Sequence, residues 1–292
     1  MTPPPLVVPF TKMSGAGNDF VVLDNRFLRF AVDELAALAE RACPRRTGVG
    51  ADGLLALEEG ESDAHFRMRY RNADGSLATM CGNGARCLAR FAARAGLGDR
   101  DGDAAALRFD TDGGPYRAEV PDPGAASGAV TLHVPPPRGF GPTGLQDGPV
   151  PRSSRVYRIW TGTEHAVVFV PDVAREDVAA AGGRLRWDGA FQPEGTNVDF
   201  VEILEGDTPR VRVRTFEKGV EAETLACGTG AVAAALAAAL TDRVAGTGRQ
   251  SVAVEMPGGT LTVGYALDDG PRDVTLAGPA DTVFEGTLEW RG

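Results

Sequence analysis

The chain has 292 residues, of which 43% are hydrophobic and 24% are charged. This is ordinary globular composition with enough apolar residues for a sizeable core, and the length predicts about two domains. The net charge of −10 argues against a basic nucleic-acid-binding surface. The 38 glycines and 20 prolines predict many turns between short elements.

No segment of the sequence predicts a signal peptide or a membrane span. The first ten residues contain four prolines and no basic residue, unlike a secretory signal. The longest apolar stretch, from Ala231 to Leu240, is too short to cross a bilayer. The four cysteines are too few for a disulfide framework in a chain of this length. We therefore expect a soluble, cytoplasmic protein with reduced thiols.

In chain order, two halves of the sequence predict similar elements. The first half predicts strand Asp19–Asp24, helix Val32–Ala42, strands Leu54–Leu57 and His65–Arg71, helix Ala85–Ala95, and strands Leu107–Asp110 and Tyr116–Val120. The second half predicts strand His165–Val170, helix Val173–Ala181, strands Val198–Ile203 and Arg210–Phe216, helix Ala231–Asp242, and strands Val252–Glu255 and Leu261–Tyr265.

The similarity extends to individual residues. Met80-Cys81-Gly82-Asn83-Gly84-Ala85 and Ala226-Cys227-Gly228-Thr229-Gly230-Ala231 place their cysteines 146 residues apart, which is half the chain. Other landmarks align at offsets of 144 to 146 residues, including Gly17 to Val22 with Gly162 to Val167, and Tyr70 with Phe216. This period is far longer than that of a solenoid. The sequence therefore predicts one domain duplicated.

The predicted fold class is α/β, of the α+β type. Two pseudo-symmetric domains are expected, each a mostly antiparallel sheet or barrel around a central helix, related by a pseudo-two-fold axis. The Pro- and Gly-rich stretch from Pro135 to Pro151 is the expected linker. We place the first domain at residues 1–133 and the second at 134–277, with the segment 278–292 returning to the first.

The two repeated cysteines are predicted to lie at helix N-termini. Free N–H groups and the helix dipole there favour negative charge, so each thiol is expected to ionise more readily. The Gly-x-Gly backbone that follows each cysteine can form an anion cradle. If the halves face each other, a bound carboxylate would lie between two cradles, with a cysteine on each side.

That arrangement suits removal of an α-proton from one face of an amino acid and its return to the other face. Lys12 and Lys218 are the only lysines, so a pyridoxal Schiff base is disfavoured and we expect no cofactor. The carbanion would then be stabilised by the N–H groups.

Other interpretations of the cysteines explain less. Cys43 and Cys87 are interpreted as small buried hydrophobes. The cysteine and histidine spacing does not match a metal site, so no metal is expected. A Cys–His nucleophile with His165 as its base would leave the second repeated cysteine unexplained.

With these motifs the chain resembles the diaminopimelate epimerase family, pyridoxal-independent enzymes that interconvert LL- and meso-diaminopimelate. The likeness covers essentially the whole chain. It rests on Ser14-Gly15-Ala16-Gly17-Asn18-Asp19-Phe20, Asn72-Ala73-Asp74-Gly75-Ser76, Met80 to Arg86, Gly195-Thr196-Asn197, Glu217-Lys218-Gly219-Val220, Glu223 to Gly230 and Gly278-Pro279-Ala280.

The resemblance implies that Cys81 and Cys227 are the catalytic acid and base, with His165 and Glu217 close to them. It implies that the substrate contacts are Asn18, Asn72, Gly82, Asn83, Thr163, Asn197, Glu217, Lys218, Gly228 and Thr229. Without the resemblance, Asn72 would be interpreted as the start of a turn and His165 as a core histidine.

Three positions depart from the family pattern. The family usually has Asn-Pro where this chain has Thr163-Glu164, and Arg where it has Lys218. Gly53 occupies a position that is Gln or Gly in the family. Lysine keeps the positive charge but cannot form the bidentate hydrogen bonds that an arginine guanidinium makes with a carboxylate. The departures therefore affect recognition of the substrate's far end, and the alternative interpretation of Lys218 is a solvated surface lysine.

We predict an isomerase that epimerises LL-diaminopimelate to meso-diaminopimelate for lysine and peptidoglycan precursor synthesis. The alternatives are a racemase of another amino acid, of the proline, hydroxyproline or histidine type, and a duplicated amino-acid-binding protein without activity. The expected partner is a small amino acid, with no nucleic acid and no membrane. The oligomeric state does not follow from the sequence, and a homodimer is the assembly we expect.

Overall fold

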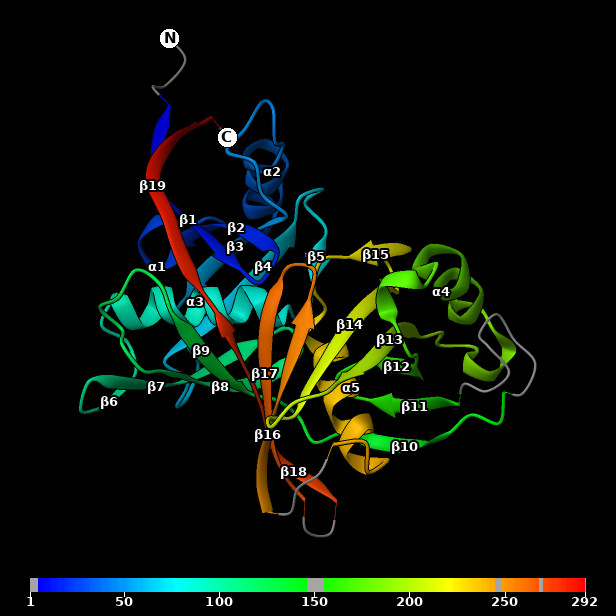
Figure 1. The fold of residues 1–292 in the computed structure, drawn as a ribbon. Helices are drawn as coiled ribbons and strands as arrows, with labels where there is room; N and C mark the ends of the chain where they lie inside the picture. The colour runs from blue at the N-terminus through cyan, green and yellow to red at the C-terminus, as the bar shows by residue number, and fades with distance from the viewer. Residues whose placement is uncertain (1–4, 146–154, 245–247, 268–269, 292) are drawn as a thin grey trace. The chain divides into compact units, whose positions relative to one another are not determined.

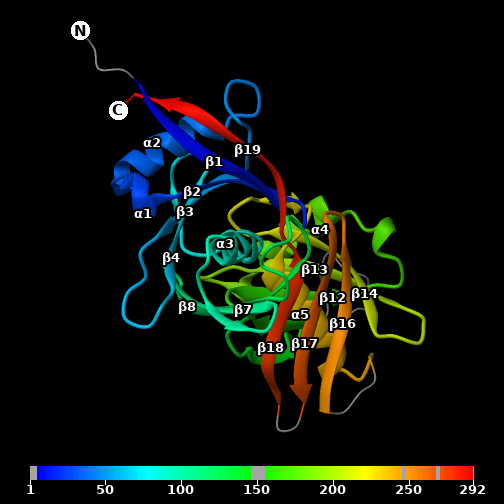
Figure 2. The same ribbon diagram turned by 90° about the vertical axis from the view of Figure 1, so that its left-hand side faces the viewer.

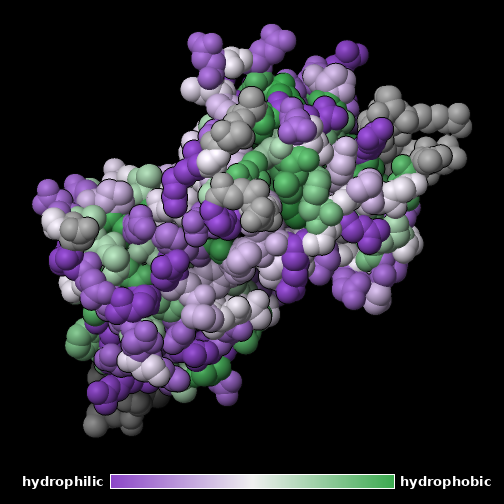
Figure 3. All heavy atoms as spheres, turned by 90° about the horizontal axis from the view of Figure 1, so that it is seen from below, coloured by the Kyte–Doolittle hydropathy of each residue, from purple (hydrophilic) through white to green (hydrophobic). Residues whose placement is uncertain are grey.

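The computed structural model describes residues 5–145, 155–244, 248–267 and 270–291. The chain divides into two compact units, residues 1–132 with 278–292, and residues 133–277. The first segment of unit 1 thus ends at residue 132, one residue before the boundary at residue 133 that the sequence predicts. Within the described residues, no helix is both long and apolar enough to cross a membrane. The face drawn in Figure 3 is mostly hydrophilic, with hydrophobic residues between.

The first unit is a sheet wrapped around helix α3 (Gly82–Arg94), which Figure 2 shows end-on with strands around it. Its strands are β1 (Leu6–Gly15), β2 (Asn18–Asp24), β3 (Gly53–Glu58), β4 (Phe66–Asn72), β5 (Leu77–Ala78), β6 (Asp99–Asp101), β7 (Ala104–Thr111), β8 (Gly114–Val120), β9 (Ala129–His133) and β19 (Asp281–Trp290). The short helix α1 (Asn25–Leu28) and helix α2 (Val32–Ala42) complete the unit (Figure 1).

The second unit repeats this plan around helix α5 (Gly228–Leu240). Its strands are β10 (Arg138–Pro142), β11 (Val156–Trp160), β12 (Glu164–Phe169), β13 (Asn197–Leu204), β14 (Arg210–Glu217), β15 (Ala222–Thr224), β16 (Gly248–Met256), β17 (Gly259–Leu267) and β18 (Pro271–Pro279). Its other helices are η1 (Val173–Arg175), α4 (Val178–Arg186) and η2 (Gly189–Phe191).

Strand pairing shows that the two units share one topology. Most strand pairs described within each unit are antiparallel, as predicted. Parallel pairs occur at matching places, β2 with β3 and β4 with β7 in the first unit, β12 with β13 and β14 with β16 in the second. The predicted fold class is confirmed, and the repeated motif corresponds to a repeated architecture.

The paired strands at the centre of each unit are buried on both faces, which explains their continuous apolar sequences. In the second unit, Ala166 and Val168 of β12 pack with Val178 and Leu185 of α4 on one face. The alternate residues of β12 face the central helix instead, because successive side chains of a strand point to opposite faces. Helix α5 is buried from residue 230 to 239, as expected for a helix that is apolar all round.

The structure differs from the sequence-based expectation in three places. The helix expected at Val173–Ala181 is split into η1 and α4, because Asp177 caps a new helix start by accepting from Ala180 N at 3.0 Å. The expected linker contains strand β10, and its part from residue 146 to 151 lies outside the described residues. Strand register makes Tyr70 equivalent to Thr215 rather than to Phe216.

Candidate active site

Both repeated cysteines are the N-cap residues of the central helices. Cys81 and Cys227 have extended backbones, and their carbonyl groups accept the first helical hydrogen bonds, from Ala85 N at 2.8 Å and Ala231 N at 2.9 Å. The N–H groups of the first residues of each helix have no acceptor within the helix. Each unit therefore presents a thiol beside free N–H groups at the positive end of a buried helix.

In the first unit, Cys81 is partly exposed, and its sulfur accepts from Gly84 N at 3.5 Å. The neighbouring Asn83 is buried, and its side chain is held from both ends. Its Oδ1 accepts from Arg86 Nη2 at 2.6 Å, and its Nδ2 donates to Asn18 Oδ1 at 2.8 Å. The predicted site residues Asn18, Cys81 and Asn83 thus lie together at the start of α3.

Asn18 is held in place by a network of charged side chains. Asn18 Nδ2 donates to Asp52 Oδ2 at 2.9 Å, and Arg45 bridges Asp52 and Asp19 at 2.6 and 2.9 Å. The buried Lys12 ammonium is 2.7 Å from Asp19. Burial alone would raise the pKa of Asp19, but Arg45 and Lys12 outweigh it and lower that pKa to about 2.

Asn72 forms the turn that its local sequence predicts. Its N–H donates to Ser76 O at 2.9 Å, and its side-chain Nδ2 donates to Ser76 Oγ, also at 2.9 Å. The structure therefore shows Asn72 in a structural role, and substrate binding by this side chain stays a prediction.

In the second unit, a line of hydrogen-bonded side chains begins at Cys227. Cys227 Sγ is 3.4 Å from Thr229 Oγ1, which is 3.0 Å from His165 Nε2. His165 Nδ1 is 2.7 Å from Asp199 Oδ2, and Thr215 Oγ1 donates to Asp199 Oδ1 at 2.8 Å. His165 and Asp199 are 1% and 0% exposed. These residues come from β12, β13, β14 and α5.

The thiol of Cys227 is not activated by its helix position alone. Burial and the carboxylates of Glu217 and Asp199 raise its pKa, and they outweigh the Thr229 hydroxyl and the Gly230 N–H, which lower it. This corrects the expectation of a readily formed thiolate for this cysteine. Burial also raises the pKa of Glu217, which ends strand β14.

The remaining predicted residues of this unit surround His165. Asn197 Nδ2 donates to Glu164 O at 3.0 Å, and its Oδ1 accepts from Lys218 N at 2.8 Å. Lys218 Nζ donates to Glu164 Oε2 at 2.7 Å, and Thr163 Oγ1 donates to the same oxygen at 3.2 Å. Two of the three departures from the family pattern, Thr163-Glu164 and Lys218, are therefore joined to each other by hydrogen bonds.

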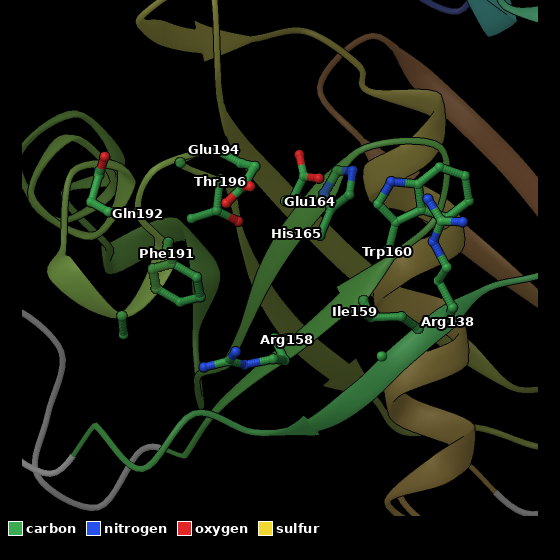
Figure 4. Close-up of a pocket in the computed structure, with 13 residues that line it drawn as sticks. Arg138, Arg158, Ile159, Trp160, Glu164, His165, Phe191, Gln192, Glu194 and Thr196 are labelled. Carbon is green, nitrogen blue, oxygen red and sulfur yellow. The ribbon is translucent and has the colours of Figure 1, made fainter.

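A pocket of about 460 Å³ opens beside these residues. Figure 4 shows Arg138 lying over Trp160 at one side, with Glu164 and His165 nearby, and the guanidinium of Arg138 is 3.7 Å from the Trp160 ring centre. Arg158 also lines the pocket, whereas Cys227 does not. No group of His, Cys, Asp and Glu side chains suited to a metal ion occurs within the residues described.

The sequence analysis missed two residues of this neighbourhood, Asp199 and Thr215, and did not assign a role to Glu164. Asp199 could have been noticed in the sequence, because it is an acidic residue within the otherwise apolar start of the predicted strand Val198–Ile203, where a buried acid needs a partner. Glu164 was noticed only as a departure from the family pattern, and its pairing with Lys218 depends on the fold.

Comparison with known proteins agrees with this arrangement. A crystal structure of a phenazine biosynthesis protein from Bacillus anthracis has the same fold, with a TM-score of 0.71 at 16% identity, over 97% of this chain and 99% of that one. The family model for diaminopimelate epimerase matches residues 10–134 and 157–283, one segment in each unit. Fold and sequence together define an isomerase built from two like α/β units.

Curated relatives specify the family. A diaminopimelate epimerase of Chlorobaculum tepidum is 42% identical over 279 residues, covering 94% of this chain and 99% of that protein. One of Thermosynechococcus vestitus is 40% identical over 296 residues, covering 96% and 98%. The chain belongs to the diaminopimelate epimerase family, as its motifs predicted.

Proposed function

We propose that the enzyme interconverts LL- and meso-2,6-diaminopimelate, and that Cys81 and Cys227 are its two acid/base residues. Membership of the diaminopimelate epimerase family supports the reaction. The observation that carries the proposal is the repeated cysteine at the start of each central helix. Inversion at carbon by proton transfer needs one proton-handling group for each face, and the duplicated unit supplies two.

In the proposed reaction, the thiolate of one cysteine removes the α-proton. The C–H bond breaks, an S–H bond forms, and the electron pair stays on the α-carbon. The thiol of the other cysteine then gives its proton to the opposite face and becomes a thiolate. Each turnover leaves one thiol and one thiolate with their roles exchanged, and the reverse reaction uses the same residues.

The negative charge that develops next to the carboxylate needs stabilisation. The backbone N–H groups of Gly82, Asn83, Gly228 and Thr229 lie in the first turns of α3 and α5, which are the positive ends of these helices. We assign the substrate's reacting carboxylate to these N–H groups. Preorganised donors of this kind commonly contribute about 3 kcal/mol each to catalysis of charge-developing steps.

The polar side chains assigned to the substrate's two ends are Asn18, Asn72, Thr163, Asn197, Glu217 and Lys218. In the free enzyme, the three asparagine amides are already hydrogen-bonded within their own units. Lys218 is paired with Glu164, so its charge is partly neutralised before substrate arrives. Recognition of the far carboxylate is therefore expected to be weaker than with an unpaired cation.

The product would serve lysine and peptidoglycan precursor synthesis, which fits a cytoplasmic enzyme. A homodimer remains the assembly we propose.

Cysteine replacement tests the assignment directly. Cys81→Ala and Cys227→Ala should each abolish epimerisation of diaminopimelate while binding, followed by calorimetry, persists. Cys43→Ala and Cys87→Ala are matched controls, because they remove buried thiols that we place outside the site, and they should retain activity. Epimerisation that survives loss of either Cys81 or Cys227 would refute the two-base mechanism.

A substrate panel tests the choice of amino acid. Exchange of the α-proton with solvent deuterium is measured on diaminopimelate, proline, lysine and histidine. Fast exchange is expected on diaminopimelate alone. Exchange on proline or histidine without exchange on diaminopimelate would show another racemase on this scaffold.

A further inference from the structure

Helix α3 carries a buried arginine close to its start. Arg86 is the fifth residue of the helix and is 0% exposed. Its guanidinium reaches back to the first turn, where Nη1 donates to Gly82 O at 3.4 Å. A buried charge costs free energy unless a partner neutralises it, and a cation at a helix N-terminus also opposes the helix dipole. A neutral side chain would avoid both costs.

The hydrogen-bond acceptors of Arg86 are neutral groups. Nη2 donates to Asn83 Oδ1 at 2.6 Å, and Nε donates to Pro279 O at 3.3 Å. Among the residues that the structure describes, no carboxylate forms an ion pair with this guanidinium. The hydrogen bonds satisfy its donors, but they leave its positive charge without a counterion.

The second unit folds without this cation. Helices α3 and α5 each have 13 residues after their cysteine caps, so Val232 occupies the place of Arg86. Helix α5 contains no charged residue along its whole length. The architecture therefore does not require a buried arginine at this position, and a functional role explains its presence better than stability does.

The negative charge that matches Arg86 is that of a thiolate. Burial lowers the pKa of Arg86, and ionised Cys87 and Cys81 oppose this shift. Burial raises the pKa of Cys87 to about 12, so this thiol stays protonated near neutral pH. Cys81 is partly exposed and caps the helix, so it is the thiol of this pair that can carry the charge.

We propose that Arg86 is a positioning residue of the first unit, which supplies the positive charge that stabilises the Cys81 thiolate and orients the side chain of Asn83. The inference rests on the proposed acid/base role of Cys81. Because an opposite charge nearby favours the ionised form of a thiol, Arg86 keeps Cys81 as a thiolate at lower pH than the helix start alone would.

Arg86 also determines how the first turn of α3 presents its amide groups. Arginine can only donate, so Asn83 turns its Oδ1 to Arg86 and its Nδ2 to Asn18. The Gly82 carbonyl that accepts from Arg86 belongs to the same peptide group as the N–H of Asn83. Hydrogen bonds in series polarise one another. This contact therefore strengthens an N–H group that we assign to the substrate's carboxylate.

The two cysteines consequently have opposite electrostatic surroundings. An unneutralised cation lies behind Cys81, whereas burial and the carboxylates of Glu217 and Asp199 raise the pKa of Cys227. In the free enzyme we therefore expect Cys81 to carry the negative charge and Cys227 to carry the proton.

Alkylation of Cys81 tests the role of the charge without relying on activity. The rate of its reaction with iodoacetamide is followed against pH by mass spectrometry, and the pH of half-maximal rate, here called the midpoint, reports ionisation. Arg86→Gln keeps a donor for Asn83 but removes the charge, whereas Arg86→Lys keeps the charge. The midpoint should rise by about one pH unit in Arg86→Gln, so that alkylation below both midpoints is roughly tenfold slower, and it should stay near wild type in Arg86→Lys.

Arg90 provides the matched control. It is also buried, one turn further along α3, and its guanidinium donates to three backbone carbonyls, those of Asp122, Ala125 and Ala129. Arg90→Gln should destabilise the protein but leave the midpoint of Cys81 unchanged. An equal shift in Arg90→Gln would show a general loosening of the helix and overturn the inference, as would an unshifted midpoint in folded Arg86→Gln.

The pH dependence of epimerisation provides the second arm. In Arg86→Gln, the pH below which kcat/KM for diaminopimelate falls should rise by about one unit, and in Arg86→Lys it should return towards the wild-type value. If Arg86→Gln does not fold, the other proteins decide the question. A raised midpoint in Arg86→Lys, or a lower midpoint for Cys227 than for Cys81 in the wild type, would then overturn the inference. Wild-type enzyme with the expected midpoints but no epimerisation of diaminopimelate would refute the proposed function alone.

Discussion

The glycines at the third position of the two central helices should respond differently to the same substitution. A Cβ at Gly230 would lie 2.5 Å from Asp199 Oδ1 and 3.2 Å from Thr215 Oγ1. Asp199 is fully buried, and each of its oxygens is hydrogen-bonded, so it has no free direction in which to move. At Gly84 the Cβ would meet the side-chain end of Leu55 at 3.2 Å, which can give way by a small rotation.

The cost at Gly230 follows from the bonds that must break. Displacing Asp199 disrupts its hydrogen bonds to His165 and Thr215, and bonds to a charged group contribute about 1.5–3 kcal/mol each. Alanine recovers up to about 1 kcal/mol over glycine in a helix. Gly230→Ala should therefore destabilise the protein by about 2–5 kcal/mol, whereas Gly84→Ala should stay within about 1 kcal/mol of wild type.

Thermal melts by circular dichroism, with urea unfolding as a second measure, compare the two variants. The apparent Tm of Gly230→Ala should fall by roughly 5–15 °C. Equal stability of the two variants would refute the claim that Asp199 is held firmly against α5. A larger loss in Gly84→Ala would refute the claim that Leu55 can give way.

Three further predictions concern charge and thiol reactivity. Asp19→Asn should cost about 1 kcal/mol of unfolding free energy at neutral pH, because folding lowers the pKa of Asp19 from 3.8 to about 2 and solvent screens part of this effect at a partly exposed carboxylate. A carboxyl group whose pKa is lower in the folded state stabilises that state only while it is ionised, at pH values above its unfolded pKa. The difference in unfolding free energy between wild type and Asp19→Asn should therefore shrink as the pH drops from about 4 to about 2. A difference that stays constant over this range in urea titrations would contradict the prediction. Glu164→Gln should release Lys218 for the substrate's far carboxylate and lower KM for diaminopimelate roughly two- to fivefold at similar kcat; an unchanged or higher KM in steady-state assays argues against that role for Lys218. Iodoacetamide should modify the partly exposed Cys81 well before Cys43, because burial raises the pKa of Cys43 to about 11; equal labelling of both by mass spectrometry would disprove the burial argument.

Much of the architecture could be predicted from local patterns. Helix Val32–Ala42 has the limits expected from its apolar spacing, and most central strands agree within one to three residues. These elements have strong periodicity, so their sequences specify them without knowledge of partners. The prediction of one helix over Val173–Ala181 was wrong, because Asp177 caps a new helix start within this alanine-rich stretch. The spacing of apolar residues does not show which acidic residue becomes a cap.

The duplication, the two cysteines at helix N-termini and membership of the family were all determined by the sequence, because each depends on residues close together in the chain or on a whole-chain pattern. Only the tertiary structure brought His165, Asp199, Thr215 and Thr229 into one hydrogen-bonded chain. These residues come from four elements, and their contacts depend on strand register, where a shift of one residue would turn a side chain to the other face. Burial, which the linear sequence does not record, reversed the expected pKa shift of Cys227, and folding paired Lys218 with Glu164.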